Sequence, residues 1–84
     1  MFENTTVLPI VNEVNEEVIK STLRDVLEAL EERGYNPVNQ LVGYLISGDL
    51  GYISSYKDAR NKISKLDRSL IIEELLKSYL RWDI

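Results

Sequence analysis

The stretch from Gly34 to Asp49, which reads GYNPVNQLVGYLISGD, constrains the fold most strongly because it defines both ends of one short helix. Asn36 is a favourable N-cap residue, and Pro37 follows at the first helical position, where a missing backbone N–H costs nothing. Gly48 readily adopts a positive φ just after the last apolar position. We therefore predict a helix of about 11 residues between Pro37 and Gly48.

The interior of this predicted helix combines an apolar stripe with a glycine. Gly43 costs roughly 1 kcal/mol relative to alanine in a helix interior. We expect the close approach of another backbone to offset that cost; the alternative is a glycine tolerated on a solvent-exposed face. Asn39 and Gln40 flank the stripe and can form hydrogen bonds across such a contact. The stripe comprises Val38, Leu41, Val42, Leu45 and Ile46. The candidate packing or dimer-contact residues here are Asn36, Pro37, Asn39, Gln40, Gly43 and Tyr44.

A longer amphipathic helix is predicted before Gly34. Either Asn12 or Asn15 serves as its N-cap, and acidic side chains in its first turn complement the helix dipole. The helix ends at Gly34, where a left-handed conformation carries no Cβ penalty. At about 100° per residue, one half of the helical wheel is charged and the other half is apolar. The apolar half holds Val18, Ile19, Thr22, Leu23, Val26, Leu27, Ala29 and Leu30.

A third helix is predicted after the turn at residues 49–52, with Ser54 or Ser55 as its cap. Arg60 falls in its apolar sector, one turn after Tyr56. We expect the guanidinium to stack on the Tyr56 ring or to reach a carboxylate, or else its stem to lie along apolar surface with its charge in water. The carboxylates considered are Asp49, Glu73 and Glu74, and the apolar positions at helical spacing are Ile53, Tyr56, Ala59, Ile63 and Leu66.

The final helix, capped by Asp67 or Ser69, is apolar over about half or more of its circumference, which is wider than the roughly 100° stripe that faces one core. We expect the excess apolar surface to be buried against a second subunit across a two-fold axis, with Leu76 and Tyr79 as candidate contacts. The alternative is that this helix is central in the monomer. Its apolar residues are Leu70, Ile71, Ile72, Leu75, Leu76, Tyr79, Leu80 and Trp82.

The chain of 84 residues is expected to form an all-α fold: a compact four-helix subunit, residues 13–84, after a flexible N-terminal tail, residues 1–12. A domain this small has a marginal core, and the absence of cysteine and histidine excludes disulfides and the usual zinc ligands. Oligomerisation is the remaining way to bury more surface, so we predict a helical homodimer. We expect a cytoplasmic protein without membrane insertion, because no apolar run is long enough to span a bilayer and the N-terminus lacks the basic residues of a signal peptide.

Catalysis has little support in this sequence. Histidine, the usual general acid or base near neutral pH, is absent. The pairs Glu73–Glu74 and Glu31–Glu32 are adjacent in sequence, diverge on a helix and are interpreted as solvent-exposed pairs. The glycines of GYNPVNQLVG lack the spacing and the lysine of phosphate-binding loops. We predict a protein that is not an enzyme and that has no catalytic, cofactor or metal site.

The distribution of charge leaves one binding hypothesis open. The net charge of −4 disfavours a nucleic-acid or anionic-membrane binder. Residues 1–33 carry eight acidic and three basic groups, whereas the stretch from Lys57 to Arg68 is locally basic. The alternative hypothesis is a small helical nucleic-acid-binding module that uses the helix around Lys57 to Lys65. A solvated basic face that balances the acidic first helix is the favoured interpretation, so we do not expect nucleic acid as a partner.

Thr5 and Thr6 lie in the expected flexible tail beside Glu3, where a kinase can bind an extended segment. A phosphate would add nearly two negative charges and three strong hydrogen-bond acceptors. The phosphorylated tail could then dock on the basic stretch or be repelled by the acidic first helix.

From Gly34 onward the sequence resembles the IreB family of small regulatory phosphoproteins of Gram-positive bacteria. The resemblance is carried, in order, by GYNPVNQLVGYLISGD, Tyr52-Ile53, KDARNKISKLDR and EELLKSYL. It implies a compact all-helical homodimer with a disordered N-terminal tail. It also implies a substrate of a transmembrane Ser/Thr kinase that monitors the cell wall, and a negative regulator of the cell-wall stress response and cephalosporin resistance. The partners so implied are a second copy, a Ser/Thr kinase and an unidentified downstream protein.

By position, the family's tail phosphothreonine falls on Thr6, which is followed here by Val7, Leu8 and Pro9 and not by a hydrophobic residue, a basic residue and Phe. A second family phosphothreonine falls near Glu3, and Thr5 is close enough to take its place. The resemblance therefore implies phosphorylation at Thr6 or Thr5. Leu50 stands where the family usually has proline after the aspartate, a change that should alter only the turn.

Overall fold

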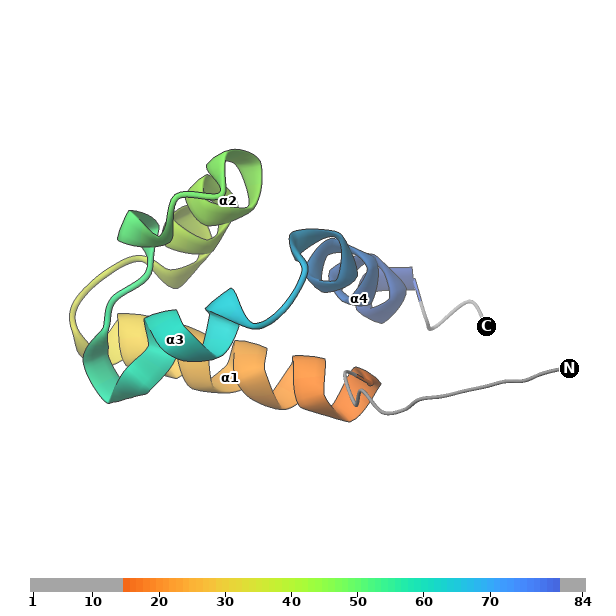
Figure 1. Ribbon diagram of the computed structural model, residues 1–84, viewed down its shortest axis with the longest axis horizontal. Helices are drawn as coiled ribbons and strands as arrows, with labels where there is room; N and C mark the ends of the chain where they lie inside the picture. The colour runs from red at the N-terminus through yellow and green to blue at the C-terminus, as the bar shows by residue number, and fades with distance from the viewer. Residues whose placement is uncertain (1–14, 81–84) are drawn as a thin grey trace, which may run out of the picture.

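The structure, a computed structural model, describes residues 15–80, and these form four α-helices with no strand among them (Figure 1). This confirms the predicted all-α class. The predicted tail, residues 1–12, lies outside the described residues. The helices are α1 (Glu16–Glu32), α2 (Pro37–Ser47), α3 (Ala59–Ser64) and α4 (Arg68–Leu80), with two 3-10 turns, η2 (Leu50–Tyr52) and η3 (Tyr56–Asp58), between α2 and α3.

Helix α1 is the element on which the other helices are assembled. It contacts α2, α3 and α4, and Figure 1 shows α3 lying along it while α2 and α4 stand over its two halves. Of its two predicted caps, Asn12 lies outside the described residues, and the Asn15 side chain accepts a hydrogen bond from the Val18 backbone N–H at 3.0 Å. Gly34 has φ +85° and reverses the chain after the helix. The buried residues of α1 are Ile19, Leu23, Val26, Ala29 and Leu30, whereas Val18 is 39% exposed and falls outside the core.

Helix α2 has the predicted bounds, for the predicted reasons. The Asn36 side chain accepts from the Asn39 N–H at 3.0 Å, and Pro37 occupies the first helical position. Gly48 has φ +75°, and its N–H donates to the Tyr44 carbonyl at 2.7 Å. The predicted apolar stripe is wrong in one respect: the buried residues are Leu41 and Tyr44, whereas Val38, Val42 and Ile46 are exposed.

Gly43 makes the expected close approach, but to an aromatic ring and not to another backbone. A Cβ at Gly43 would overlap the Tyr52 side chain, whose Cζ would lie 2.8 Å away. The prediction of a backbone contact is therefore wrong, and so is the alternative of a glycine on a solvent-exposed face. The Gln40 amide donates to the Tyr52 carbonyl at 2.9 Å, as expected for a residue that flanks this contact. Together these contacts hold η2 against α2.

The third helix is shorter than predicted. Lys57 and Asp58 adopt left-handed conformations, with φ 53° and 64°, so α3 begins only at Ala59. Neither predicted cap lies at the start of α3: Ser54 accepts a hydrogen bond from the Tyr56 N–H at 3.0 Å, and Ser55 is the N-cap residue of η3 but makes no side-chain cap hydrogen bond. Non-glycine residues rarely adopt this conformation, and the helical spacing of the apolar residues extends across it. The spacing of the apolar residues therefore predicted a helix that begins too early, before the two left-handed residues.

The core lies where α1, α2, α3 and the segment before α3 meet. Helix α4 begins after Asp67, the first of its two predicted caps, whose carbonyl accepts from the Leu70 and Ile71 N–H groups at 3.1 and 3.2 Å. Ile71 is the only residue of α4 in the buried hydrophobic cluster within residues 15–80. That cluster is Ile19, Leu23, Val26, Ala29, Leu30, Leu41, Tyr44, Ile53, Ala59, Ile63, Leu66 and Ile71.

Candidate functional site

Helix α4 exposes a continuous apolar face. Ile72, Leu76 and Tyr79 recur at i, i+4 and i+7, which places them on one side of the helix, with exposed fractions of 41%, 57% and 76%. Leu75 and Leu80 border this face at 38% and 45%. The alternative prediction, a helix at the centre of the monomer, is wrong, because only Ile71 and Glu74 of α4 are buried.

Helix α2 exposes a second apolar face. Val38, Val42 and Ile46 recur every four residues and therefore lie in one row along the helix. They are 66%, 47% and 79% exposed. The opposite side of α2, with Leu41 and Tyr44, faces the core. Two helices thus present apolar side chains to solvent in a chain whose buried core is small.

Arg68 connects the helices that carry these faces. Its Nη1 atom donates to the Leu45 carbonyl in the last turn of α2 at 3.1 Å. Its Cζ would lie 2.9 Å from a Cβ placed at Gly48, so the guanidinium packs over the glycine that ends α2. A cation beside the C-terminal carbonyls of a helix is electrostatically favourable. This contact connects the start of α4 to the end of α2.

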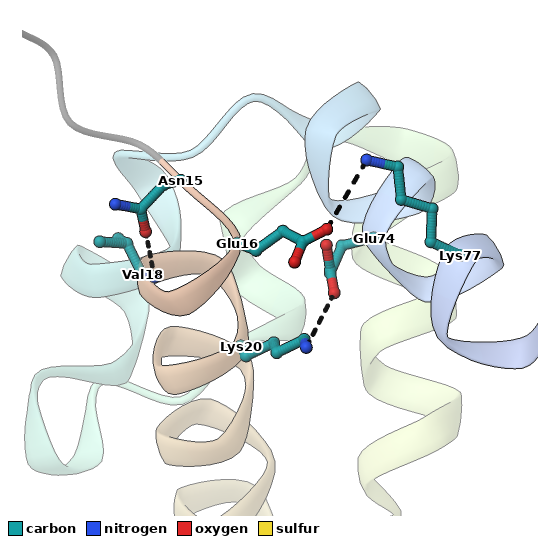
Figure 2. Close-up of polar contacts among 6 residues, drawn as sticks. All are labelled: Asn15, Glu16, Val18, Lys20, Glu74 and Lys77. Atoms are coloured by element: carbon teal, nitrogen blue, oxygen red, sulfur yellow. Dashed lines mark hydrogen bonds and ion pairs between the residues drawn. The ribbon is translucent and has the colours of Figure 1, made fainter. Parts of the chain in front are cut away.

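Polar side chains join α1 to α4 at the end of α1 where the described chain begins (Figure 2). Glu74 is only 5% exposed, and its Oε2 lies 3.8 Å from Lys20 Nζ. Lys77 Nζ lies 3.8 Å from Glu16 Oε2 and 3.9 Å from Glu73 Oε2, and all three of these side chains are more than half exposed. The interpretation of Glu73 and Glu74 as a solvent-exposed pair is therefore wrong for Glu74, because packing against α1 covers that side of α4.

Arg60 makes neither of the predicted contacts. Its Nε donates to the Ile53 carbonyl at 2.8 Å, which ties α3 to the segment before it. The Tyr56 ring is covered instead by two other cations: Arg33 Cζ lies 5.2 Å and Lys57 Nζ 5.5 Å from the ring centroid. Such cation–π contacts connect the end of α1 to η3.

The basic stretch faces the acidic side of α1. Lys57 Nζ lies 3.0 Å from Glu32 Oε1, and Lys62 Nζ lies 3.1 Å from Asp25 Oδ2. The hydrogen bond from Lys57 lowers the pKa of Glu32 from its ordinary value, and the same bond raises the pKa of Lys57. Two of the lysines that a recognition helix would use are thus engaged within the subunit. This arrangement fits a basic face that balances α1.

The residues predicted as packing or dimer contacts fall into two groups. Asn36, Gln40, Gly43 and Tyr44 act within the subunit, as a cap, a hydrogen-bond donor, a contact for the Tyr52 ring and a core side chain. Pro37 begins α2, and Arg60 joins α3 to Ile53. Asn39, Leu76 and Tyr79 are exposed. Thr5 and Thr6 lie outside the described residues.

Sequence reasoning missed the Glu74–Lys20 pair, the contact of Arg68 with α2 and the exposed row on α2. The only advance signal for Glu74 is that it lies three residues after Ile71, on the same side of α4. No such signal exists for Arg68, because the partner carbonyl is 23 residues away in the chain. These features arise from contacts between helices.

No helix among residues 15–80 combines the length and the apolar character needed to cross a bilayer.

A comparison with protein families identifies the chain over nearly its whole length. A family model described as IreB regulatory phosphoprotein matches residues 3–81. The match covers the four helices and also Thr5 and Thr6. The chain therefore belongs to the IreB family of regulatory phosphoproteins.

Proposed function

We propose that this protein is a non-catalytic regulatory protein that is phosphorylated near its N-terminus and functions as a homodimer. Membership of a family of regulatory phosphoproteins carries the regulatory part of the proposal. The exposed apolar face of α4 is the observation that supports the homodimer. Each part makes a separate prediction and can fail without the other.

The proposed modification is phosphorylation of Thr6 or Thr5 by a Ser/Thr protein kinase. The family match includes both threonines, and a hydroxyl converted to a phosphate gains nearly two negative charges. By resemblance to the family, we propose that the kinase is a transmembrane enzyme that monitors the cell wall. The protein would then act as a negative regulator of the cell-wall stress response and of cephalosporin resistance, through a downstream protein still to be identified.

The kinase proposal is tested by incubating the full chain with a Ser/Thr kinase of this class and ATP, then locating phosphate by mass spectrometry. Modification is expected at Thr6 or Thr5, with loss of the signal in the Thr5→Ala/Thr6→Ala double variant. Each single variant identifies the acceptor. If the double variant is phosphorylated as strongly as the parent chain, the assigned threonines are wrong.

The homodimer proposal rests on the face of Ile72, Leu76 and Tyr79. Fully burying an aliphatic or aromatic side chain of this size is worth about 1.5–3 kcal/mol. Between 41% and 76% of each side chain remains to be buried, and two-fold symmetry counts each residue twice, so this burial can offset part of an association cost of about 4–15 kcal/mol. Within a domain of this size such burial is a large addition to a small core. Sedimentation equilibrium is expected to show a dimer, and a monomer at micromolar concentration would contradict the proposal.

The nucleic-acid alternative makes an opposite prediction. A module that binds through Lys57 to Lys65 would bind duplex DNA with an affinity that falls as salt rises. Because Lys57 and Lys62 already pair with Glu32 and Asp25, we expect no such binding at 50 mM salt in a fluorescence anisotropy titration. Salt-dependent binding in that assay would favour the alternative.

A further inference from the structure

The apolar side chains of α4 leave the rotation of this helix poorly determined. Ile71 is buried, but the next residue is also isoleucine, and Leu75 is followed by a second leucine. Successive residues point about 100° apart around a helix. A rotation of α4 by one residue would place Ile72 in the core in place of Ile71, with no change in the type of side chain buried. Hydrophobic burial alone therefore discriminates weakly between these orientations.

Glu74 does discriminate between them. It lies three residues after Ile71, on the same side of α4, and its side chain is only 5% exposed. The rotation just described would put Leu75 in its place, opposite the Lys20 ammonium. The observed rotation instead brings Glu74 Oε2 to 3.8 Å from Lys20 Nζ, as Figure 2 shows. Of these two orientations, only the observed one gives this partly buried lysine an opposite charge at that position.

Stability alone does not account for a carboxylate at this position. Removing a charge from water is costly, and well-packed apolar residues often stabilise a contact as well as a buried ion pair or better. Buried polar groups can instead select one packing arrangement among several. The other cross-helix ion pair near this point, between Lys77 and Glu16, is exposed, and such pairs contribute little. The long Arg68 side chain, which reaches α2 from the first residue of α4, can adapt to several rotations.

We propose that Glu74 and Lys20 form a positioning pair, which sets the rotation of α4 on α1 and thereby turns Ile72, Leu76 and Tyr79 outward as the face for a second copy. The positioning role concerns α1 and α4 within one chain. Its consequence for assembly rests on the proposed homodimer.

The test measures helix position and assembly separately, in the full chain. Because the sequence has no cysteine, Ser21→Cys on α1 and Ser78→Cys on α4 allow two spin labels to be placed at exposed positions. Pulsed electron paramagnetic resonance, with labelled chains diluted in unlabelled chains, reports the α1–α4 distance within one subunit. Sedimentation reports the dimer dissociation constant, and circular dichroism reports helix content. These readouts are compared for the parent chain, Glu74→Leu, Lys20→Glu and the exchange variant Lys20→Glu/Glu74→Lys.

Glu74→Leu is expected to retain its helix content while its distance distribution shifts or broadens and its dissociation constant rises at least about tenfold, since a buried polar pair that selects one arrangement has been lost. Lys20→Glu places like charges together, so its distance distribution should also shift or broaden and its dissociation constant should also rise. The exchange variant should regain the narrow distribution, a rescue that mere filling of space would not produce. An unchanged distribution and dissociation constant in Glu74→Leu would overturn the proposal.

If Glu74→Leu loses helix content, the exchange variant decides: rescue relative to Lys20→Glu supports the positioning pair, and no rescue overturns it. The two proposals fail in distinguishable ways. A monomeric parent chain contradicts the homodimer, while the α1–α4 distance in Glu74→Leu still decides the role of the pair. A parent dimer whose Glu74→Leu variant matches it in both readouts contradicts the positioning pair alone.

Discussion

Replacing Leu76 with glutamate tests the exposed face of α4 most directly. In the single subunit the Leu76 side chain is 57% exposed, so Leu76→Glu leaves the carboxylate in water and changes the stability of the isolated fold little. In a dimer that buries this face, the same carboxylate enters apolar surface without a partner. The variant is therefore expected to dissociate the dimer while the helices of the subunit remain folded.

The expected magnitude follows from the exposed fraction. Fully burying a leucine is worth about 1.5–3 kcal/mol, and somewhat more than half of its surface remains to be buried, so about 1 kcal/mol or more is lost per copy. Two-fold symmetry doubles the loss to about 2 kcal/mol or more, a factor of about 30 in the dissociation constant. Desolvation of two unpaired carboxylates adds to this cost. We expect the dissociation constant to rise more than about 100-fold.

Sedimentation equilibrium of the parent chain and Leu76→Glu across a concentration series measures this change, with circular dichroism as the check on folding. Val18→Glu is the matched control, because Val18 is also a partly exposed apolar residue but lies on α1, two residues from Lys20 and so on the opposite side of the helix. The control should keep the parent dissociation constant. If Leu76→Glu stays as dimeric as the control, this face of α4 is not the dimer contact.

Three further predictions concern contacts within the subunit. Gly43→Ala should destabilise the fold by about 1–3 kcal/mol in urea unfolding, even though alanine favours helices, because its Cβ would overlap the Tyr52 ring; in a Tyr52→Ala background the same substitution should cost little. Asn36→Ala should cost about 0.5–2 kcal/mol by removing the cap of α2, whereas no loss in thermal unfolding would refute the capping role. The lowered pKa of Glu32 means that its pair with Lys57 stabilises the fold above the unfolded-state pKa and that this contribution is lost as the pH falls through the folded pKa. In Lys57→Met, an NMR titration should show the Glu32 pKa moving back up towards its ordinary value.

Several features of this fold were predictable from the sequence because their causes lie within a few residues of one another. The bounds of α2 follow from Asn36, Pro37 and Gly48. The Asn36 side chain accepts from the backbone N–H three residues later, and the glycine permits the positive φ that ends the helix. The start of α1 at Asn15 and the chain reversal at Gly34 have the same local origin. Apolar periodicity also predicted which side of α1 enters the core, because that helix has a single apolar side.

Where a helix has two apolar sides, periodicity does not say which of them faces the core. On α2, Leu41 and Tyr44 are buried in the core, whereas Val38, Val42 and Ile46 are exposed. On α4, Ile71 is buried and Ile72 is exposed. The exposed face of α4 is the one proposed as the dimer contact, whereas the exposed row on α2 was not predicted. The phosphorylation sites, Thr5 and Thr6, remain predictions from resemblance and family membership.

The sequence by itself determined where α1 ends and where α2 begins and ends, since capping groups, prolines and glycines act on their immediate neighbours. Only the tertiary structure decided that Tyr52 covers Gly43, that Lys57 and Asp58 are left-handed, and that one glutamate of an adjacent pair is buried against Lys20. The physical reason is that each of these features depends on a contact with a second element, and local propensity does not specify which element packs there. In a chain with so small a core, such contacts decide which apolar side chains are left for a partner.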